Sequence, residues 1–334
     1  MKNVMLLFSM LLALTFTACS DDDNNSPDGD PTPPENENIL NGMITENRTL
    51  DPSVDYHLTG ILSVESGAKL TIPAGTHIST NTGTDVYIAV QQGGKINIQG
   101  TSAKPVIMEP SETGTWGGLL LLGKAETTAG ANAIAEVGQL VYGGTDNSDS
   151  SGSIQYLIIR DSGAQINPES QYNGLTLYAV GSGTIIENVA IIGGADDGIE
   201  FFGGTVNVSK VYVENLEDDA IDWTEGWNGN LTNTYVIHNI ADFSTAIEAD
   251  GVNQNPNIIN FTAVSTTGGT ALQFKIESGA TIAGLSLNGY ETSIDFKDGG
   301  AVSNVQIEGQ DSDPSQSYSN PATVNLADFG WAID

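Results

Sequence analysis

The chain has 334 residues, of which 39 % are apolar and 7 % aromatic, so a sizeable core can form and global disorder is excluded. Its 42 acidic residues against 10 basic ones give a formal net charge of −32. This charge excludes nucleic acid and anionic membrane surfaces as electrostatic partners, because both would be repelled, but it permits cations and neutral sugars. A single cysteine excludes a disulfide framework, and three scattered histidines argue against a zinc site.

The first residues have the features of a lipoprotein signal peptide. Lys2 carries a positive charge, and residues 4–16 form an almost wholly apolar run that is short for a membrane span. Residues 14–19 resemble a bacterial lipobox, so we expect residues 1–18 to be removed and Cys19 to be acylated. The alternative is an ordinary signal peptide with a chance cysteine. Two or three acyl chains on Cys19 suffice for stable membrane anchoring.

An acidic tether is expected to follow the anchor over residues 19–38. Residues 21–23 are three aspartates, and residues 24–38 contain no apolar run that could enter a core. The aspartates resemble the signal that sends Bacteroidetes lipoproteins to the outer face of the outer membrane. The alternative is a solvated spacer. We therefore expect a lipid-anchored outer-membrane protein that faces the cell exterior.

From residue 39 onward, short apolar strands recur at intervals of 20 to 26 residues and are separated by Gly, Asn, Asp and Ser. One set begins at Val189, Val211, Tyr235, Phe261, Leu285 and Val305, and a second has apolar anchors at Ile199, Ile221, Ile247, Leu272 and Ile294. This interval is too short for a propeller blade and lacks the signature of a leucine-rich repeat. It fits an all-β parallel β-helix of about 11 or 12 coils over residues 39–310.

The ends of such a stack are open strand edges, which invite aggregation unless they are covered. We expect residues 39–58 to cover one end and a C-terminal cap at residues 311–334 to cover the other. Phe329 and Trp331 are expected to pack over the last coil. Residues 125–137 are the only soft helix candidate, and their Thr and Gly content argues against a helix.

Two segments point to a family. Residues 196–207 (DDGIEFFGGTVN) and 218–227 (DDAIDWTEGW) resemble motifs of a family of Bacteroidetes surface lipoproteins with a pectate-lyase-like fold. Residues 60–76 and 93–119 resemble the early coils of bacterial right-handed β-helix proteins. The resemblance covers roughly residues 55–310 and implies a right-handed parallel β-helix. It implies no particular reaction.

The second set of strands predicts a ladder of polar side chains. Their apolar residues alternate and point inward, so the residues between them point outward. These outward residues are Glu200, Asp222, Glu248, Gln273 and Asp295, and we call them the ladder. Like charges one strand spacing apart repel, so the ladder needs an explanation.

Three explanations of the ladder stay open. A bound calcium ion could be held by Asp197, Asp219, Asp222 and Glu248, because calcium takes six to eight oxygen ligands. Salt bridges from Lys275 and Lys297 could neutralise it instead. The third explanation is a solvated face on a very acidic protein.

An acidic groove beside lysines also resembles the sites of β-helix polysaccharide lyases. That resemblance implies Lys275 as the base, with Asp222 and Glu248 in the catalytic set. The pattern is incomplete, because the only arginines, Arg48 and Arg160, lie outside the ladder coils. A polygalacturonase-like site is also incomplete, since His238 does not lie between glycines.

Aromatic residues give a second binding hypothesis. Trp223 is expected to point into the core. Trp227 lies in a turn that no packing pattern explains, so it either packs over the turn or holds a sugar ring beside carboxylates. We take Glu200, Trp227 and Asp250 as the candidate ligand-binding residues.

Three functions remain. The favoured one is a non-catalytic surface lipoprotein whose acidic β-helix face binds glycans or surface proteins. The second is a calcium-assisted polysaccharide lyase or glycosidase. The third is a structural adhesion or surface-coat protein, which the sequence does not separate from the first.

Overall fold

The computed structural model describes residues 38–168, 170–252 and 254–333. The expected signal peptide, Cys19 and all of the expected tether except Asn38 lie outside the described residues. Within these ranges the chain is almost entirely strand and turn, with two short 3-10 helices, η1 (Val302–Asn304) and η2 (Leu326–Phe329). No helix in this part of the chain is long and apolar enough to cross a membrane.

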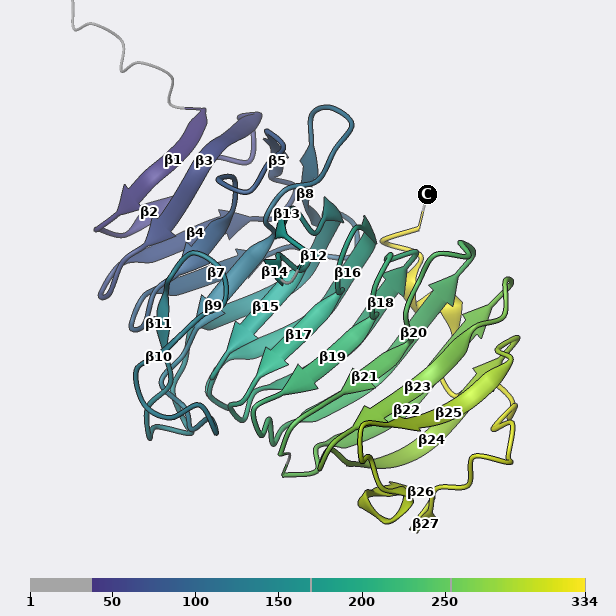
Figure 1. The fold of residues 1–334 in the computed structure, drawn as a ribbon. Coiled ribbons are helices and arrows are strands. Elements are labelled where there is room, and N and C mark those ends of the chain that lie inside the picture. Colours follow the sequence, from purple (N-terminus) through teal and green to yellow (C-terminus); the bar gives the residue numbers. More distant parts are fainter. Residues whose placement is uncertain (1–37, 169, 253, 334) are drawn as a thin grey trace, which may run out of the picture. The chain divides into compact units, whose positions relative to one another are not determined.

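Parallel strands stack in three columns around a continuous apolar interior, which is the expected right-handed parallel β-helix (Figure 1). The column that carries the ladder, which we call the ladder sheet, contains β1 (Ile39–Ile44), β3 (Tyr56–Val64), β6 (Ile88–Val90), β9 (Leu119–Leu122), β15 (Leu175–Tyr178), β17 (Ile199–Phe202), β19 (Ile221–Thr224), β21 (Ile247–Ala249), β23 (Thr270–Lys275) and β25 (Thr292–Lys297).

The second sheet contains β2 (Arg48–Thr49), β4 (Lys69–Pro73), β7 (Lys95–Gln99), β12 (Gly152–Ser162), β16 (Ile185–Gly194), β18 (Asn207–Glu214), β20 (Asn230–His238), β22 (Asn257–Ser265), β24 (Ala280–Asn288) and β26 (Val305–Ile307). The third sheet is made by β1 and β3, by β5 (His77–Thr80) and β8 (Val106–Pro110), and by the second halves of β12, β16, β18, β20, β22 and β24.

Each column passes through ten strands of the described residues, one or two fewer than the expected number of coils. The difference arises because residues 123–150 leave the repeat. The long strands bend between the second and third sheets at residues with positive φ, such as Asn188 (57°), Asn233 (59°) and Asn260 (57°). Asparagine tolerates this left-handed backbone better than most residues, which explains its recurrence at the bend.

The strand register confirms most of the expected repeat. Ile199 pairs with Ile221, and Ile247 with Leu272. The first set was misaligned at two positions: Val211 pairs with Thr234 rather than Tyr235, and Val305 pairs with Ala280. Thr234 takes the buried position, whereas Tyr235 points out and packs against the cluster on the outer side of the third sheet.

Two insertions cover part of the outer face of the ladder sheet. The lobe, residues 123–150, contains the antiparallel strands β10 (Ala133–Ile134) and β11 (Val141–Tyr142), and no helix forms there. The hairpin contains β13 (Gln165–Asn167) and β14 (Ser170–Gln171). The lobe packs Tyr142 against Tyr178, which stacks on Phe202. Phe202 therefore points outward from the ladder sheet but is buried beneath the lobe.

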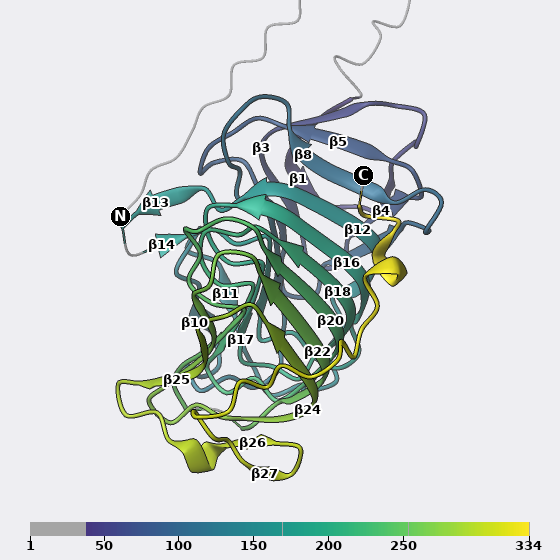
Figure 2. The same ribbon diagram turned by 90° about the vertical axis from the view of Figure 1, so that its right-hand side faces the viewer.

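The ends of the stack differ from the expectation. Residues 39–49 form the first strands of the helix itself, paired in parallel with β3 and β4. At the other end β26 pairs with β27 (Gln310–Asp311). The chain then returns along the outer face of the third sheet (Figure 2), where Phe329 stacks on Tyr212 at 5.7 Å between ring centres.

The expected packing of Phe329 and Trp331 over the last coil is wrong. Trp331 contacts Tyr156 edge to face, with ring centres 5.2 Å apart. Tyr156 belongs to β12, which is far along the chain from β25. The physical reason is that the third sheet presents apolar side chains outward, including Ile158, Ala190 and Tyr212, and these need cover.

Candidate functional site

The ladder forms on adjacent strands as predicted. Glu200 pairs with Asp222, Asp222 with Glu248, Glu248 with Gln273, and Gln273 with Asp295. Each pair occupies neighbouring strands of the ladder sheet, about 4.8 Å apart. The carboxyl groups therefore stand in one row along the stacking direction.

Lysines and an amide compensate the end of the ladder that is nearer the C-terminus. Lys275 and Gln273 both donate to Glu248, and Lys297 lies 3.7 Å from Asp295. Burial lowers the pKa of Lys275, but its hydrogen bond to Glu248 and the nearby carboxyl charges outweigh burial and raise it. Lys275 is therefore protonated at neutral pH, which argues against the expected role as a general base.

The other end of the ladder is uncompensated. Carboxyl oxygens of Asp197, Glu200 and Asp222 all lie within 4.8 Å of one another. Oδ1 of Asp222 is buried and has no hydrogen-bond partner in the described part of the chain. Burial raises the pKa of all three groups well above the usual range, and the charge of Asp222 adds to the effect at Asp197 and Glu200.

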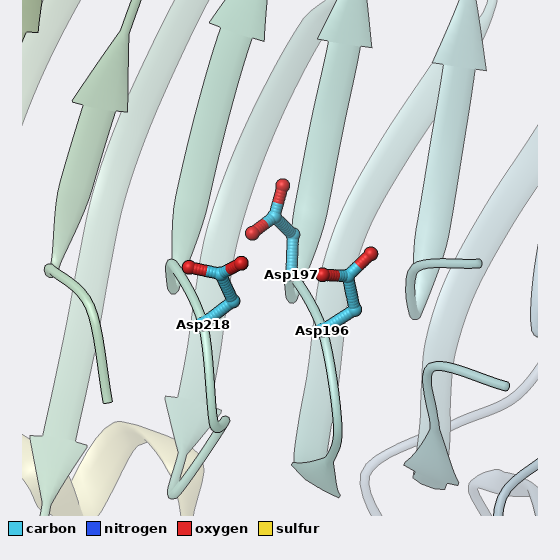
Figure 3. Close-up of side chains that lie close together, drawn as sticks. All are labelled: Asp196, Asp197 and Asp218. Carbon is cyan, nitrogen blue, oxygen red and sulfur yellow. The ribbon is translucent and has the colours of Figure 1, made fainter. Parts of the chain in front are cut away.

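A second group of three shares Asp197. Oxygens of Asp196, Asp197 and Asp218 also lie within 4.8 Å of one another, on the turns that precede β17 and β19 (Figure 3). The backbone N–H of Asp219 donates to Oδ1 of Asp197 at 3.0 Å. This bond holds the two turns together.

The predicted metal set is only partly brought together. Asp197 and Asp222 belong to one group, and Glu200 completes it instead of Asp219 and Glu248. Asp219 accepts a hydrogen bond from Thr245 at 2.5 Å, and Glu248 is engaged by Lys275. The alternation rule placed these residues on one face but gave no information about their partners.

An open pocket of about 220 Å³ lies over the acidic end of the ladder. Its walls come from the two insertions, and its lining is Glu136, Pro168, Ser170, Gln171, Asp196, Asp197, Glu200 and Asp218. Gln171 donates to Asp196 at 2.7 Å, and Asn173 donates to Glu200 at 2.6 Å. We call this the acidic pocket.

Two carboxyl groups of the acidic pocket titrate near neutrality. Burial, together with the charge of Asp218, raises the pKa of Asp196 to about 7. Burial and the charge of Glu225 raise the pKa of Glu136 to about 7. Such a cluster can hold protons, or it can bind a cation that takes their place.

A family model described as the pectate-lyase-like β-helix domain matches residues 42–319. The chain belongs to this family. A search of the curated proteins gives no match. The family description suggests a carbohydrate-related role and does not separate binding from catalysis.

In this pectate-lyase-like domain the prediction for Trp227 is wrong. Trp227 is fully buried, stacks on Phe201 with ring centres 3.9 Å apart, and donates from Nε1 to the carbonyl of Val206 at 3.1 Å. It fills part of the interior and offers no ring face to a sugar. Trp223 is buried as predicted. Asp250 accepts from Thr224 at 2.8 Å and lies beside the ladder.

Sequence reasoning missed Glu136, Gln171 and Asn173. Glu136 lies in the lobe, Gln171 in β14 of the hairpin and Asn173 shortly after it, all outside the regular repeat. The only available signal was the interruption of the repeat between residues 119 and 175, which marks inserted segments without saying where they fold back. His238 is buried against Tyr290, with Nδ1 2.9 Å from the hydroxyl, and is structural as expected.

Proposed function

We propose that this pectate-lyase-like β-helix is a non-catalytic carbohydrate-binding domain, held at the outer face of the outer membrane by acylated Cys19. Its acidic pocket binds glycan together with a divalent cation. The observation that supports this most directly is the group of Asp197, Glu200 and Asp222, with a buried and unpartnered oxygen on Asp222. Burying carboxylates so close together is costly unless a cation or protons compensate them.

The donor set favours calcium among the cations. Each of the three residues offers a carboxylate oxygen, and hard oxygen ligands suit calcium, whereas zinc and copper favour imidazole and thiolate. Asn173 adds a buried oxygen without a hydrogen-bond partner, and its amide nitrogen already contacts Glu200. Bound calcium neutralises the cluster and offers open coordination positions to sugar oxygens.

Binding without catalysis is favoured by the charge around the pocket. Lys275, the candidate base, is occupied by Glu248. The described residues that line the acidic pocket include no Lys or Arg, so they offer no fixed cation to orient an anionic polymer or stabilise a developing carbanion.

A glycosidase is the second candidate. Asp196 and Glu136 line one pocket, and the pKa of each is raised to about 7. A carboxyl group that keeps its proton near neutral pH is suited to donate it to a leaving oxygen.

Glycan-array binding of the purified domain, with calcium and with chelator, tests the proposal. We expect binding with a calcium-dependent part, and we expect that part to be lost in an Asp197→Asn, Asp222→Asn double variant, without release of reducing ends or unsaturated uronates. Product formation that depends on Asp196 would contradict the non-catalytic function and favour the glycosidase. If the domain binds no glycan in calcium or in chelator, carbohydrate binding is excluded and the structural or adhesion function is favoured.

The anchor has its own test. Cys19→Ala is expected to move the full-length protein from the membrane fraction to the soluble fraction. Deletion of residues 21–23 is expected to keep it membrane-bound but protected from protease added to intact cells. Membrane retention of the Cys19→Ala protein would exclude acylation as the anchor.

A further inference from the structure

A second pocket lies at the opposite end of β17 and β19. The acidic pocket is at the turns that precede these strands, whereas the second pocket is lined by residues that follow them, including Gly204, Glu225 and Asn228. The lobe supplies the other wall through residues such as Thr128 and Thr145. Its volume is about 420 Å³, within the range of small-ligand sites.

The centre of this pocket is fixed before any ligand arrives. Glu225 has a left-handed backbone, with φ of 54°, which is uncommon for a residue with a side chain. Its carboxyl group accepts from the hydroxyl of Thr127 at 2.5 Å and from that of Tyr142 at 2.8 Å. Tyr142 is itself held against Tyr178. Two lobe residues thus orient one carboxyl group of the ladder sheet.

Close contacts also hold the lobe against the turn after β17, where the wall and floor of the pocket meet. A Cβ atom at Gly203 would lie 2.6 Å from Cβ of Thr127, so the lobe approaches the turn after β17 as closely as glycine allows. Thr205 donates to the carbonyl of Asn147 at 2.6 Å. These contacts join the lobe to the β-helix at the pocket, so its polar groups are pre-organised.

The lining chemistry selects an uncharged, hydroxyl-rich ligand. Among the described residues, the lining of this pocket includes Glu126 and Glu225 but no Lys or Arg, so phosphate and uronate groups are repelled. Hydroxyl and amide side chains dominate the rest of the lining, which disfavours an apolar ligand. Both close groups of three metal-ligating side chains found in the described residues lie at the ladder and its turns, and neither includes a residue of this pocket.

We propose that this pocket is a calcium-independent subsite for one neutral sugar unit. Glu225 accepts from sugar hydroxyls, while Asn228 and Thr145 hydrogen-bond at the rim. This inference rests on the proposed carbohydrate-binding function and assigns it a second location with a different ligand charge.

Isothermal titration with cellotetraose, mannotetraose and tetragalacturonate, in calcium and in chelator, tests the subsite. Asn228→Ala removes an exposed amide, and Thr145→Trp fills the pocket. We expect each to weaken neutral tetrasaccharide binding about tenfold or more. Asn228→Ala removes one or two hydrogen bonds to the sugar, and Thr145→Trp occupies the space that the sugar needs. Glu112→Ala, in an exposed loop, is the matched control, and circular dichroism verifies folding of every variant.

The outcomes separate this inference from the proposed function. Neutral binding that survives chelator and Asp222→Asn but falls in both pocket variants supports the subsite. Neutral binding that is unchanged in both pocket variants overturns the subsite and leaves carbohydrate binding intact. Binding of no tetrasaccharide by the wild-type protein overturns the subsite together with the proposed function.

Discussion

Asp222 and Glu248 occupy the same outward position on neighbouring strands, yet their surroundings differ. Glu248 accepts from Lys275 and Gln273, whereas Oδ1 of Asp222 is buried without a hydrogen-bond partner in the described residues. The distinction comes from the residue on the next strand, because β23 supplies a lysine and an amide while β17 supplies another carboxyl group. The electrostatic free energy of each ladder carboxyl group therefore depends mainly on the side chains of the adjacent strand.

Asp222→Asn is expected to stabilise the protein in chelator by about 1–2 kcal/mol, because it removes a carboxyl group whose ionisation is opposed by burial and by the charges of Asp219 and Glu248. The same change is expected to abolish most of the stabilisation that calcium gives. Denaturant titrations with calcium and with chelator measure both effects. Asp295→Asn is the matched control, since Asp295 is more exposed and pairs with Lys297, and its effect is expected below about 0.5 kcal/mol. Equal effects of the two substitutions would contradict the cation site.

Lys275→Met is expected to destabilise the protein by about 1–3 kcal/mol, because it leaves the buried Glu248 with its amide partner alone. Lys297→Met is the matched control on the next strand, where the lysine side chain is 53 % exposed compared with 27 % for Lys275. Its expected cost is below about 1 kcal/mol. Urea denaturation of the two variants checks the difference, and similar losses would show that the Lys275 bond adds little.

Among the inserted elements, the lobe is the one that lines both candidate sites. It supplies Glu136 to the acidic pocket and Thr127 to the second pocket, and it buries Phe202 between them. The hairpin adds Gln171 to the first pocket only. Two insertions into a regular repeat thus give one face of the β-helix two open pockets of different chemistry. This follows the general tendency of functional groups to lie on loops that a rigid scaffold positions.

Gly203→Ala is expected to loosen the lobe. Its φ is 66°, and the new Cβ would meet Cβ of Thr127 at 2.6 Å, so strain and steric overlap act together. We expect faster hydrogen exchange across residues 126–145 and weaker ligand binding at both pockets. Gly299→Ala is the control, because its φ of 93° is strained but no atom lies within 4 Å of the new Cβ. Unchanged exchange in the lobe of the Gly203→Ala protein would show that the contact is not needed for docking.

Over the whole molecule, the carboxyl groups whose pKa values are raised most lie on β17, on β19 and on the turns that precede these strands. Asp196, Asp197, Glu200 and Asp222 all have raised pKa values because burial and neighbouring carboxyl charges disfavour ionisation. A carboxyl group with a raised pKa in the folded state stabilises the fold fully below its unfolded pKa, near 4. That contribution is lost as the pH rises through the raised value.

In chelator, the melting temperature is therefore expected to fall between about pH 4 and pH 7–8, the window set by the pKa of about 7 for Asp196 and Glu136. Calcium at a hundred times its dissociation constant adds about 2.7 kcal/mol and should oppose this fall near pH 7. Sodium at matched ionic strength is the control for screening. Identical pH profiles in calcium and sodium would contradict a specific site.

The repeat and the ladder could both be predicted from the order of the residues alone. Alternation of apolar and polar residues places Ile221 and Trp223 inside and Asp222 outside, and the coil interval sets Glu200, Asp222 and Glu248 side by side. Both follow from period-two strand geometry and from burial, which act on residues that are neighbours along the chain or one coil apart.

Which carboxyl groups are compensated, and where the pockets form, depends instead on tertiary packing. Trp227 is interior and Glu136 reaches the ladder because segments outside the repeat pack according to the space and apolar surface that the coils leave open. For the same reason, Phe329 packs against Tyr212 and not over the last coil. Such packing depends on contacts between residues that lie far apart in sequence, and no periodicity encodes them.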